Sequence, residues 1–319
     1  MSSTFMVTGA LGFIGSRLTE QLLDDGYDVI GVDCVTDAYD PAEKLARLEV
    51  LREHPHYRHS GADLADAPLD DLLSGVEVVY HLAGRAGVRD SFTSLAKYRH
   101  DNVQATQNLL SSVRRAPTVR RLVYASSSSV YGNADLPFDE EGPTNPLSPY
   151  GQSKLDAERL CLESNGDCVE TLALRYFTVY GPGQRPDMGL RLFAEAAIER
   201  RPLKLFGDGT QSRDFTYVDD VVAATRRAAD ASVSGVAINV GGGSRITLLE
   251  VFEILGQLTG EQIRIDHESF ARGDAMHTGA SLERAQRLLN FRAEVDFARG
   301  YAAQVQWLRS RLSNTGSVA

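Results

Sequence analysis

The stretch FMVTGALGFIGSRL, residues 5 to 18, decides the fold. An apolar run at residues 5 to 8 leads into Gly9, Gly12 and Gly15, spaced three residues apart, and then into an amphipathic segment. Glycines in such a turn let the backbone bend tightly and let a pyrophosphate approach the positive end of the following helix. The stretch therefore predicts the first strand, turn and helix of a dinucleotide-binding fold.

Asp33 ends the next apolar run, YDVIGVD at residues 27 to 33. A carboxylate at the end of the second strand accepts a hydrogen bond from a ribose 2′-hydroxyl and would repel a 2′-phosphate. We therefore expect NAD, and not NADP, as the cofactor.

Strand and helix patterns alternate through the first half of the chain. Further apolar runs lie at residues 76–83, 121–126 and 169–176, and amphipathic segments lie around 13–25, 41–53, 92–115 and 149–165. This alternation predicts an α/β protein with a Rossmann-type, doubly wound parallel sheet.

The pattern becomes less regular after about residue 177, where the loop GPGQRPDMG (181 to 189) begins. We expect a smaller, partly interleaved C-terminal substrate domain. The predicted division is a cofactor domain over 1–177 with a returning segment at about 214–240, and a substrate domain over 178–213 and 241–319.

Composition excludes several other classes. The 319 residues carry a formal charge of −10 and give a pI near 5.2, which argues against a nucleic-acid binder. Three cysteines without metal or disulfide spacing favour a reducing compartment, and no apolar run approaches the ~20 residues of a membrane span. We expect a cytoplasmic protein. HPHYRH (54 to 59) lacks acidic or cysteine ligands, so no metal site is predicted.

Two motifs carry the chemistry. ASSSSVYG (125 to 132) follows an apolar run, although a serine run by itself is typical of a linker. SPYGQSK places Tyr150 and Lys154 one helical turn apart. A cation beside a phenol favours the phenolate and lowers the tyrosine pKa from about 10, although such a pair also arises by chance.

Together with HLAG (81 to 84), these motifs resemble, in order and spacing, those of the extended short-chain dehydrogenase/reductase superfamily. The resemblance covers nearly the whole chain and is to the nucleotide-sugar epimerases and dehydratases. AGVRDSF (86 to 92) and FTVYGPGQRPDM (177 to 188) look most like the UDP-glucuronate 4-epimerases. The resemblance implies NAD-dependent conversion of UDP-glucuronate to UDP-galacturonate through a transient 4-keto sugar.

The resemblance also implies a catalytic triad of Ser127, Tyr150 and Lys154. Ser127 would hydrogen-bond the sugar 4-hydroxyl and help pass its proton to the Tyr150 phenolate, while Lys154 would hold the nicotinamide ribose and tune the tyrosine. The expected cofactor-binding residues are Gly9, Gly12, Phe13, Ile14, Gly15, Asp33, Asp63, Leu64, Leu82, Ala83, Gly84, Asn102, Tyr150, Lys154 and Tyr176.

Arg185 is expected to meet the sugar carboxylate, with hydroxyls donating beside it, although a surface pair with Asp187 is the simpler interpretation from sequence alone. Arg213 matches a diphosphate-binding arginine, Phe206 should line the uracil pocket, and the roles of Arg89 and Arg272 stay open. The expected substrate-binding residues are Arg89, Ser127, Ser128, Thr178, Arg185, Phe206, Arg213 and Arg272.

Several alternatives remain at this point. Ser128 and Ser129 are poor acid–base groups, which disfavours elimination of water. The other candidate activities are a neutral UDP-hexose 4-epimerase and a UDP-glucuronate decarboxylase. A non-catalytic NAD-binding regulator is the alternative of another class. Because relatives pair the helices matching 92–115 and 149–165 across a two-fold axis, the resemblance also implies a homodimer through a four-helix bundle.

Overall fold

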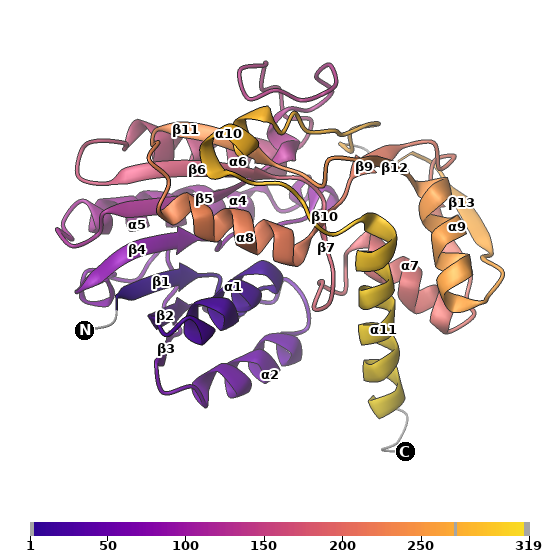
Figure 1. Cartoon of the computed structure of the whole chain (residues 1–319), viewed down its shortest axis with the longest axis horizontal. Helices are drawn as coiled ribbons and strands as arrows, with labels where there is room; N and C mark the ends of the chain where they lie inside the picture. Colours follow the sequence, from indigo (N-terminus) through magenta and orange to yellow (C-terminus); the bar gives the residue numbers. More distant parts are fainter. Residues whose placement is uncertain (1–2, 271–272, 316–319) are drawn as a thin grey trace.

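Seven parallel strands form the central sheet of the computed structural model, which describes residues 3–270 and 273–315. The strand order is β11-β6-β5-β4-β1-β2-β3, so the chain reverses its direction of winding between β1 and β4 (Figure 1). The strands are β1 (Thr4–Thr8), β2 (Asp28–Val32), β3 (Tyr57–Ser60), β4 (Val76–His81), β5 (Arg121–Ser127), β6 (Glu170–Tyr176) and β11 (Val236–Val240). The predicted Rossmann-type sheet is confirmed.

The two faces of this sheet bury different side chains of the same strands. Phe5 and Val7 of β1 pack in one core cluster with Leu18, whereas Met6 between them packs in another with Leu109. This alternation is the period of two that a strand imposes. Helices α1 (Phe13–Asp24), α2 (Pro41–Arg52), α8 (Val218–Ala229) and α10 (Glu283–Leu289) contribute to the first cluster, and α5 (Ala105–Val113) and α6 (Pro149–Glu163) to the second.

A second core lies beside the carboxyl ends of the strands, on the right in Figure 1. It is built by α7 (Gly189–Ile198), α9 (Leu248–Thr259), α11 (Phe297–Thr315), β8 (Leu203–Phe206) and β13 (Ile265–Glu268). Two short strand pairs connect the parts: β7 (Val179–Tyr180) with β10 (Thr216–Tyr217), and β9 (Ser212–Asp214) with β12 (Arg245–Thr247).

The interleaving of the two parts goes further than the sequence indicates. The chain leaves the main sheet after β6 and returns to it through α8 and β11. It returns a second time, because Ala285, Leu289 and Phe291 pack in the core of the main sheet. The segment around α10 therefore belongs physically with the sheet, although the sequence pattern placed it in the substrate domain.

The predicted amphipathic helix over 92–115 is helical from Leu95 to Val113 but contains a π-helical segment, and a separate short helix precedes it. The structure has short helices α3 (Val88–Ser91) and α4 (Leu95–Tyr98), a π-helical segment η2 (Arg99–Gln104) and then α5. The wider π turn holds Asn102 where its amide meets the backbone of Arg85, accepting from N at 2.6 Å and donating to O at 3.0 Å. Such π segments occur frequently at functional sites. Two 3₁₀ turns complete the elements, η1 (Asp71–Leu73) and η3 (Ser128–Val130).

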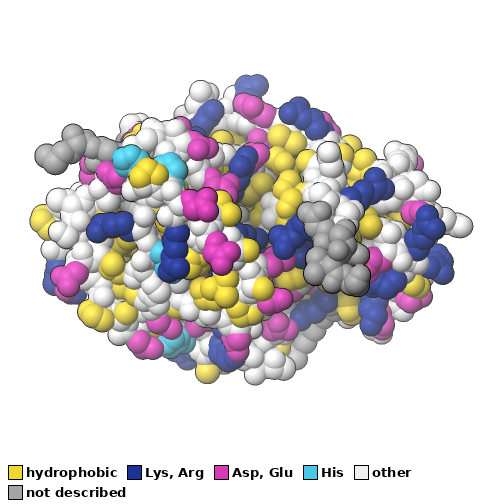
Figure 2. All heavy atoms as spheres, turned by 90° about the horizontal axis from the view of Figure 1, so that it is seen from below, with side chains coloured by type: hydrophobic (Ala, Val, Ile, Leu, Met, Phe, Trp, Pro, Cys, Tyr) yellow, Lys and Arg dark blue, Asp and Glu magenta, His cyan; other side chains and the backbone are white. Residues whose placement is uncertain are grey.

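Charges of both signs are spread over the face seen in Figure 2, with hydrophobic side chains between them. Within residues 3–270 and 273–315, no helix combines the length and the apolar character needed to cross a bilayer.

A buried ion pair fastens α6 to the sheet. Arg175 on β6 donates to Glu158 from Nη2 at 2.6 Å and from Nε at 3.0 Å, and the two side chains are 6% and 2% exposed. Ser126 on β5 donates to the same carboxylate at 2.5 Å. Arg175 also donates to the Tyr131 hydroxyl, which donates to Asn239 on β11.

A second buried network orders the strand ends near the glycine turn. His81 lies between the hydroxyls of Thr8 and Thr106, at 2.8 and 2.9 Å. Thr106 donates to the carbonyl of Asn102, so it accepts from His81 Nε2, and His81 Nδ1 accepts from Thr8. Thr8 in turn accepts from the backbone N of Ala83. This arrangement needs a neutral imidazole, and burial lowers the pKa of His81 to about 3.

Glu158→Gln should destabilise the protein by about 3–5 kcal/mol, because it leaves the buried charge of Arg175 without its counter-ion. Urea unfolding followed by circular dichroism measures this free energy. The control is Asp230→Asn, which breaks the exposed pair between Asp230 and Arg120 and should cost no more than about 1 kcal/mol. Equal effects of the two substitutions would contradict the structural role of the buried pair.

His81 should make stability fall in mild acid. Its pKa is near 6.5 when unfolded and about 3 when folded, so below about pH 6.5 only the unfolded chain takes up this proton. The free energy of unfolding should therefore drop by about 1.4 kcal/mol between about pH 7.5 and 5.5 through this group alone.

Urea unfolding of wild type and His81→Gln at both pH values isolates that contribution. The variant should show the smaller drop, whereas His56→Gln, on the exposed surface, should keep the wild-type dependence. Parallel pH curves for wild type and His81→Gln would refute the assignment.

Candidate active site

One large cleft, of about 1030 Å³, lies between the carboxyl ends of the sheet strands and the second core. Open α/β sheets bind ligands at this edge, where the strand order reverses. The cleft is lined by the glycine turn after β1, by the serine run, and by β8 and β9.

The glycine turn fits a dinucleotide pyrophosphate. Gly9 has a φ of +71°, and a Cβ there would lie 2.8 Å from the backbone N of Ala83. A Cβ on Gly15 would lie 2.1 Å from the carbonyl oxygen of Gly9. The turn is therefore closed to side chains, and it leaves backbone exposed to the cleft at the start of α1. The predicted cofactor residues that line the cleft are Gly9, Gly12, Phe13, Ile14, Gly15, Asp33, Asp63, Leu64, Leu82, Ala83, Gly84, Tyr150, Lys154 and Tyr176.

Asp33 lies at the end of β2, where a carboxylate that binds the adenine ribose is expected. It already has hydrogen-bond partners within the protein. It accepts from the backbone N of Leu11 at 3.2 Å and of Val35 at 3.0 Å, and it pairs with Lys44 Nζ at 2.7 Å. Lys44 lines the cleft too, and sequence reasoning missed it because nothing in its helix distinguishes it from other surface lysines. The pair holds the Asp33 carboxylate beside the cleft.

Asn102 is placed differently from the prediction. It is buried and does not line the cleft, because its amide binds the backbone of Arg85 and donates to Ser153 at 2.8 Å. A Cβ on Gly84 would lie 2.9 Å from its Oδ1. Asn102 thus supports the Gly84–Arg85 turn, and direct contact with the cofactor stays a prediction.

The serine run is the end of a strand followed by a tight turn. Ser127 ends β5, and its hydroxyl lies 2.5 Å from that of Ser129 and accepts from the Ser129 backbone N at 3.2 Å. Both hydroxyls lie close enough to the Tyr150 phenol to lower its pKa. Tyr150 is brought there by α6, whose first turn is capped by Ser148. The linker interpretation is excluded, and Ser129 joins the site although sequence reasoning did not include it.

The electrostatics of Tyr150 differ from the expectation. Burial raises the pKa of Tyr150, and this effect outweighs the opposing influence of the Ser127 hydrogen bond, the Arg185 charge and the Ser129 hydrogen bond. Lys154 is not among these influences. Its Nζ lies 4.3 Å from the centre of the Tyr124 ring, and burial lowers the pKa of Lys154 to about 8. The cation acting on the phenol is therefore Arg185.

The position of Arg185 is compatible with both interpretations that the sequence left open, a pair with Asp187 and a site for the sugar carboxylate. Its Nε and Nη2 donate to the two carboxylate oxygens of Asp187, at 3.0 and 2.5 Å. Both residues also line the cleft, and Arg185 is only 14% exposed. The arginine is thus paired and at the same time close enough to Tyr150 to lower its pKa.

The other predicted substrate residues lie at the far end of the cleft. The guanidinium of Arg89 covers the Phe206 ring, 3.9 Å from its centre. Arg213 donates to the carbonyls of Ser212 and Met276, and burial lowers its pKa. Cleft-lining members of the predicted set are Arg89, Ser127, Ser128, Thr178, Arg185, Phe206 and Arg213. Arg272 lies outside the described residues.

Helix α2 connects the glycine turn with the loop that carries Arg185. Arg47 donates to the carbonyl of Leu11 in the glycine turn and to that of Gly183 in the loop that carries Arg185, both at 2.8 Å. Glu43, one turn earlier, pairs with Arg191 on α7 at 2.7 Å. No sequence motif marks these residues, because their partners are distant in the chain.

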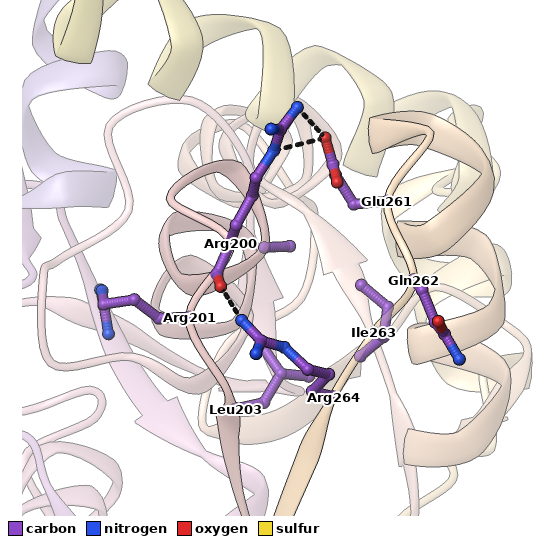
Figure 3. Close-up of a pocket in the computed structure, with 8 residues that line it drawn as sticks. Arg200, Arg201, Leu203, Glu261, Gln262, Ile263 and Arg264 are labelled. Atoms are coloured by element: carbon purple, nitrogen blue, oxygen red, sulfur yellow. Dashed lines mark hydrogen bonds and ion pairs between the residues drawn. The ribbon is translucent and has the colours of Figure 1, made fainter.

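A smaller cavity of about 220 Å³ lies between α7 and the segment before β13 (Figure 3). Its arginines already have partners: Arg200 pairs with Glu261, Arg264 donates to the carbonyl of Arg200, and Arg201 pairs with Glu199. The cavity holds no acid–base group beside a nucleophile, so the large cleft is the candidate active site.

Known proteins are similar to this chain along nearly its full length. A UDP-glucuronate 4-epimerase of Thermodesulfobacterium geofontis is 37% identical, over 98% of both chains. The structure of the UDP-glucuronic acid 4-epimerase from Bacillus cereus, in complex with UDP-glucuronic acid and NAD, superposes with a TM-score of 0.93 at 33% identity, covering 97% of this chain and 99% of that one.

MoeE5, in complex with UDP-glucuronic acid and NAD, gives a TM-score of 0.89 at 40% identity, covering 97% of this chain and 100% of that one. The model of the NAD dependent epimerase/dehydratase family matches residues 5–241. These matches confirm the resemblance seen in the sequence and the prediction of NAD. The chain belongs to the NAD-dependent epimerase/dehydratase family.

Proposed function

We propose that this chain converts UDP-glucuronate to UDP-galacturonate by NAD-dependent epimerisation at C4 of the sugar. The observation that carries the proposal is the grouping of Arg185, Tyr150, Ser127 and Ser129 in one cleft. The hydroxyls and the phenol provide a proton path, and the arginine provides a carboxylate site within reach of it. The similarity to proteins whose structures contain UDP-glucuronic acid and NAD supports the same substrate.

NAD, when bound, supplies the acceptor and donor of the C4 hydride. The glycine turn would hold its pyrophosphate, Asp33 its adenine ribose, and Lys154 the nicotinamide ribose. The closed backbone at Gly9 and Gly15 and the buried carboxylate of Asp33 fit this placement.

Tyr150 acts as the base for the sugar 4-hydroxyl in this proposal. Its phenolate takes the proton while C4 is oxidised, and the phenol returns it when C4 is reduced on the other face. Ser127 hydrogen-bonds the 4-hydroxyl, and Ser129 fixes the Ser127 hydroxyl at 2.5 Å. The positive charge of Arg185 favours the phenolate that the first step needs.

The alternatives are less well supported. Serines at positions 128 and 129 supply no acid–base pair for elimination. A neutral UDP-hexose remains the second candidate substrate, because a second structure of MoeE5 contains UDP-glucose and NAD. The intact set of Ser127, Tyr150 and Lys154 in the cleft argues against a regulator without activity.

The two parts of the chain, each with its own core, are proposed to bind different ligands. We propose that residues 1–177, with 214–240 and the segment around α10, hold NAD, and that the rest of 178–213 and 241–319 holds the UDP group. Arg213 and Phe206 come from this second part, and both line the cleft.

We also propose a homodimer in which α5 and α6 of two copies form a four-helix bundle. The two helices pack against each other on one face of the sheet. Leu160 and Leu162 on α6 are only partly buried in the monomer, which leaves apolar surface for a partner copy.

Tyr150→Phe should reduce turnover of UDP-glucuronate by at least 100-fold, because it removes the proton acceptor. Binding of UDP-glucuronate should stay within a few-fold of wild type. Proton NMR of the reaction mixture identifies the product, and calorimetry measures binding. Tyr98→Phe is the matched control, since Tyr98 touches Tyr150 edge-on but donates to backbone carbonyls.

Formation of UDP-galacturonate by wild type, and its loss in Tyr150→Phe, is the expected result. A pentose product in wild type would favour decarboxylation, and conversion of UDP-glucose alone would favour the neutral-sugar alternative. Near wild-type turnover in Tyr150→Phe would contradict the role of the phenol.

The dimer should give a mass near 70 kDa in light scattering, twice the 34.8 kDa of the chain. Leu160→Arg, at the proposed interface, should shift the mass toward that of one chain, whereas Leu45→Arg, on the exposed face of α2, should not. A wild-type mass near that of one chain at micromolar concentration would contradict the dimer.

A further inference from the structure

The Arg185–Asp187 ion pair is placed where a substrate carboxylate should bind. Two guanidinium nitrogens face the two oxygens of Asp187, at 3.0 and 2.5 Å, so the pair is bidentate. Both side chains line the cleft, and they are 14% and 42% exposed. Asp187 is thus the part of the pair that reaches solvent.

This fork is the arrangement by which arginine holds a carboxylate of a ligand. A glucuronate carboxylate that takes the same two nitrogens must displace Asp187 or share them with it. Among the described residues, the ion pair of Arg185 is with Asp187 alone. The Tyr39 ring lies 5.7 Å from the guanidinium, and the charge of Arg185 lowers the pKa of Tyr98 and of Tyr150.

We propose that Asp187 is an internal counter-ion that occupies the Arg185 fork until a sugar carboxylate replaces it, and that it thereby sets the discrimination between acidic and neutral UDP-sugars. The inference rests on the proposed function, because it takes Arg185 as the carboxylate site. A neutral sugar leaves the ion pair intact and meets no unpaired arginine. An acidic sugar gains the arginine only by releasing Asp187.

Asp187 therefore reduces the preference of the protein for UDP-glucuronate over UDP-glucose. Its side chain can turn into water when displaced, since nearly half of it is already exposed. The cost of displacing it is that of a partly exposed ion pair, which corresponds to roughly a five-fold effect on affinity. Removing the charge of Asp187 should tighten binding of UDP-glucuronate and leave a neutral sugar facing an unpaired cation.

The test compares Asp187→Asn, Asp187→Glu and wild type with UDP-glucuronate and with UDP-glucose. Asp230→Asn removes the same charge from an exposed pair and serves as the control. Calorimetry on proteins that also carry Tyr150→Phe measures binding without turnover, and steady-state kinetics give KM and kcat separately.

Asp187→Asn should bind UDP-glucuronate roughly five-fold more tightly and lower its KM, with little change in kcat. Affinity for UDP-glucose should stay the same or fall, so the preference for the acid rises. Asp187→Glu, which restores the charge, should return the preference toward wild type, and Asp230→Asn should leave it unchanged.

Weaker binding of UDP-glucuronate by Asp187→Asn would overturn the inference, because it would mean that Asp187 orients Arg185 for the substrate. An unchanged preference would overturn it as well. Failure of the proposed function is visible separately, since wild type would then neither bind nor convert UDP-glucuronate before any substitution is made.

Discussion

The ion pair between Glu158 and Arg175 is the interaction on which the arrangement of the site depends. Tyr150 and Lys154 lie on the same helix as Glu158, and Ser127 directly follows the serine that donates to this carboxylate. A buried charge pair of this kind contributes little net stability compared with an apolar contact, but it allows only one geometry. It fixes how far α6 can slide or rotate against β5, and therefore where the phenol meets the Ser127 hydroxyl.

The fold class and the cofactor end of the cleft could be predicted because their causes are local in sequence. A glycine turn between a strand and a helix works through its own backbone, and the next strand brings Asp33 to the same edge. The spacing of Tyr150 and Lys154 places both on one side of a helix without reference to the rest of the chain. For the same reason the five strands with predicted ranges, β1, β2, β4, β5 and β6, lie close to those ranges.

The remainder depends on contacts between distant segments, which no local pattern encodes. The pairing of Lys44 with Asp33, and the reach of Arg47 from α2 to Gly183, arise only when the sheet has assembled. The π-helical segment around Asn102 interrupts a pattern that reads as one continuous helix. The electrostatic environment of Tyr150 also could not be predicted, because the cation that lowers its pKa comes from the loop after β7 and not from its own helix.

The four consecutive serines have different environments although they are identical residues. Ser126 is buried and donates to the Glu158 carboxylate, whereas Ser127, its neighbour, is partly exposed and its hydroxyl lies beside that of Ser129. Side chains alternate between the faces of a strand, so a shift of one residue exchanges these environments. An alignment displaced by one serine would keep the composition and the identity score, yet it would equate a buried residue that anchors α6 with a residue proposed to hydrogen-bond the substrate. Within such homopolymeric runs, residue equivalence between relatives has to be established by superposition and not by letters.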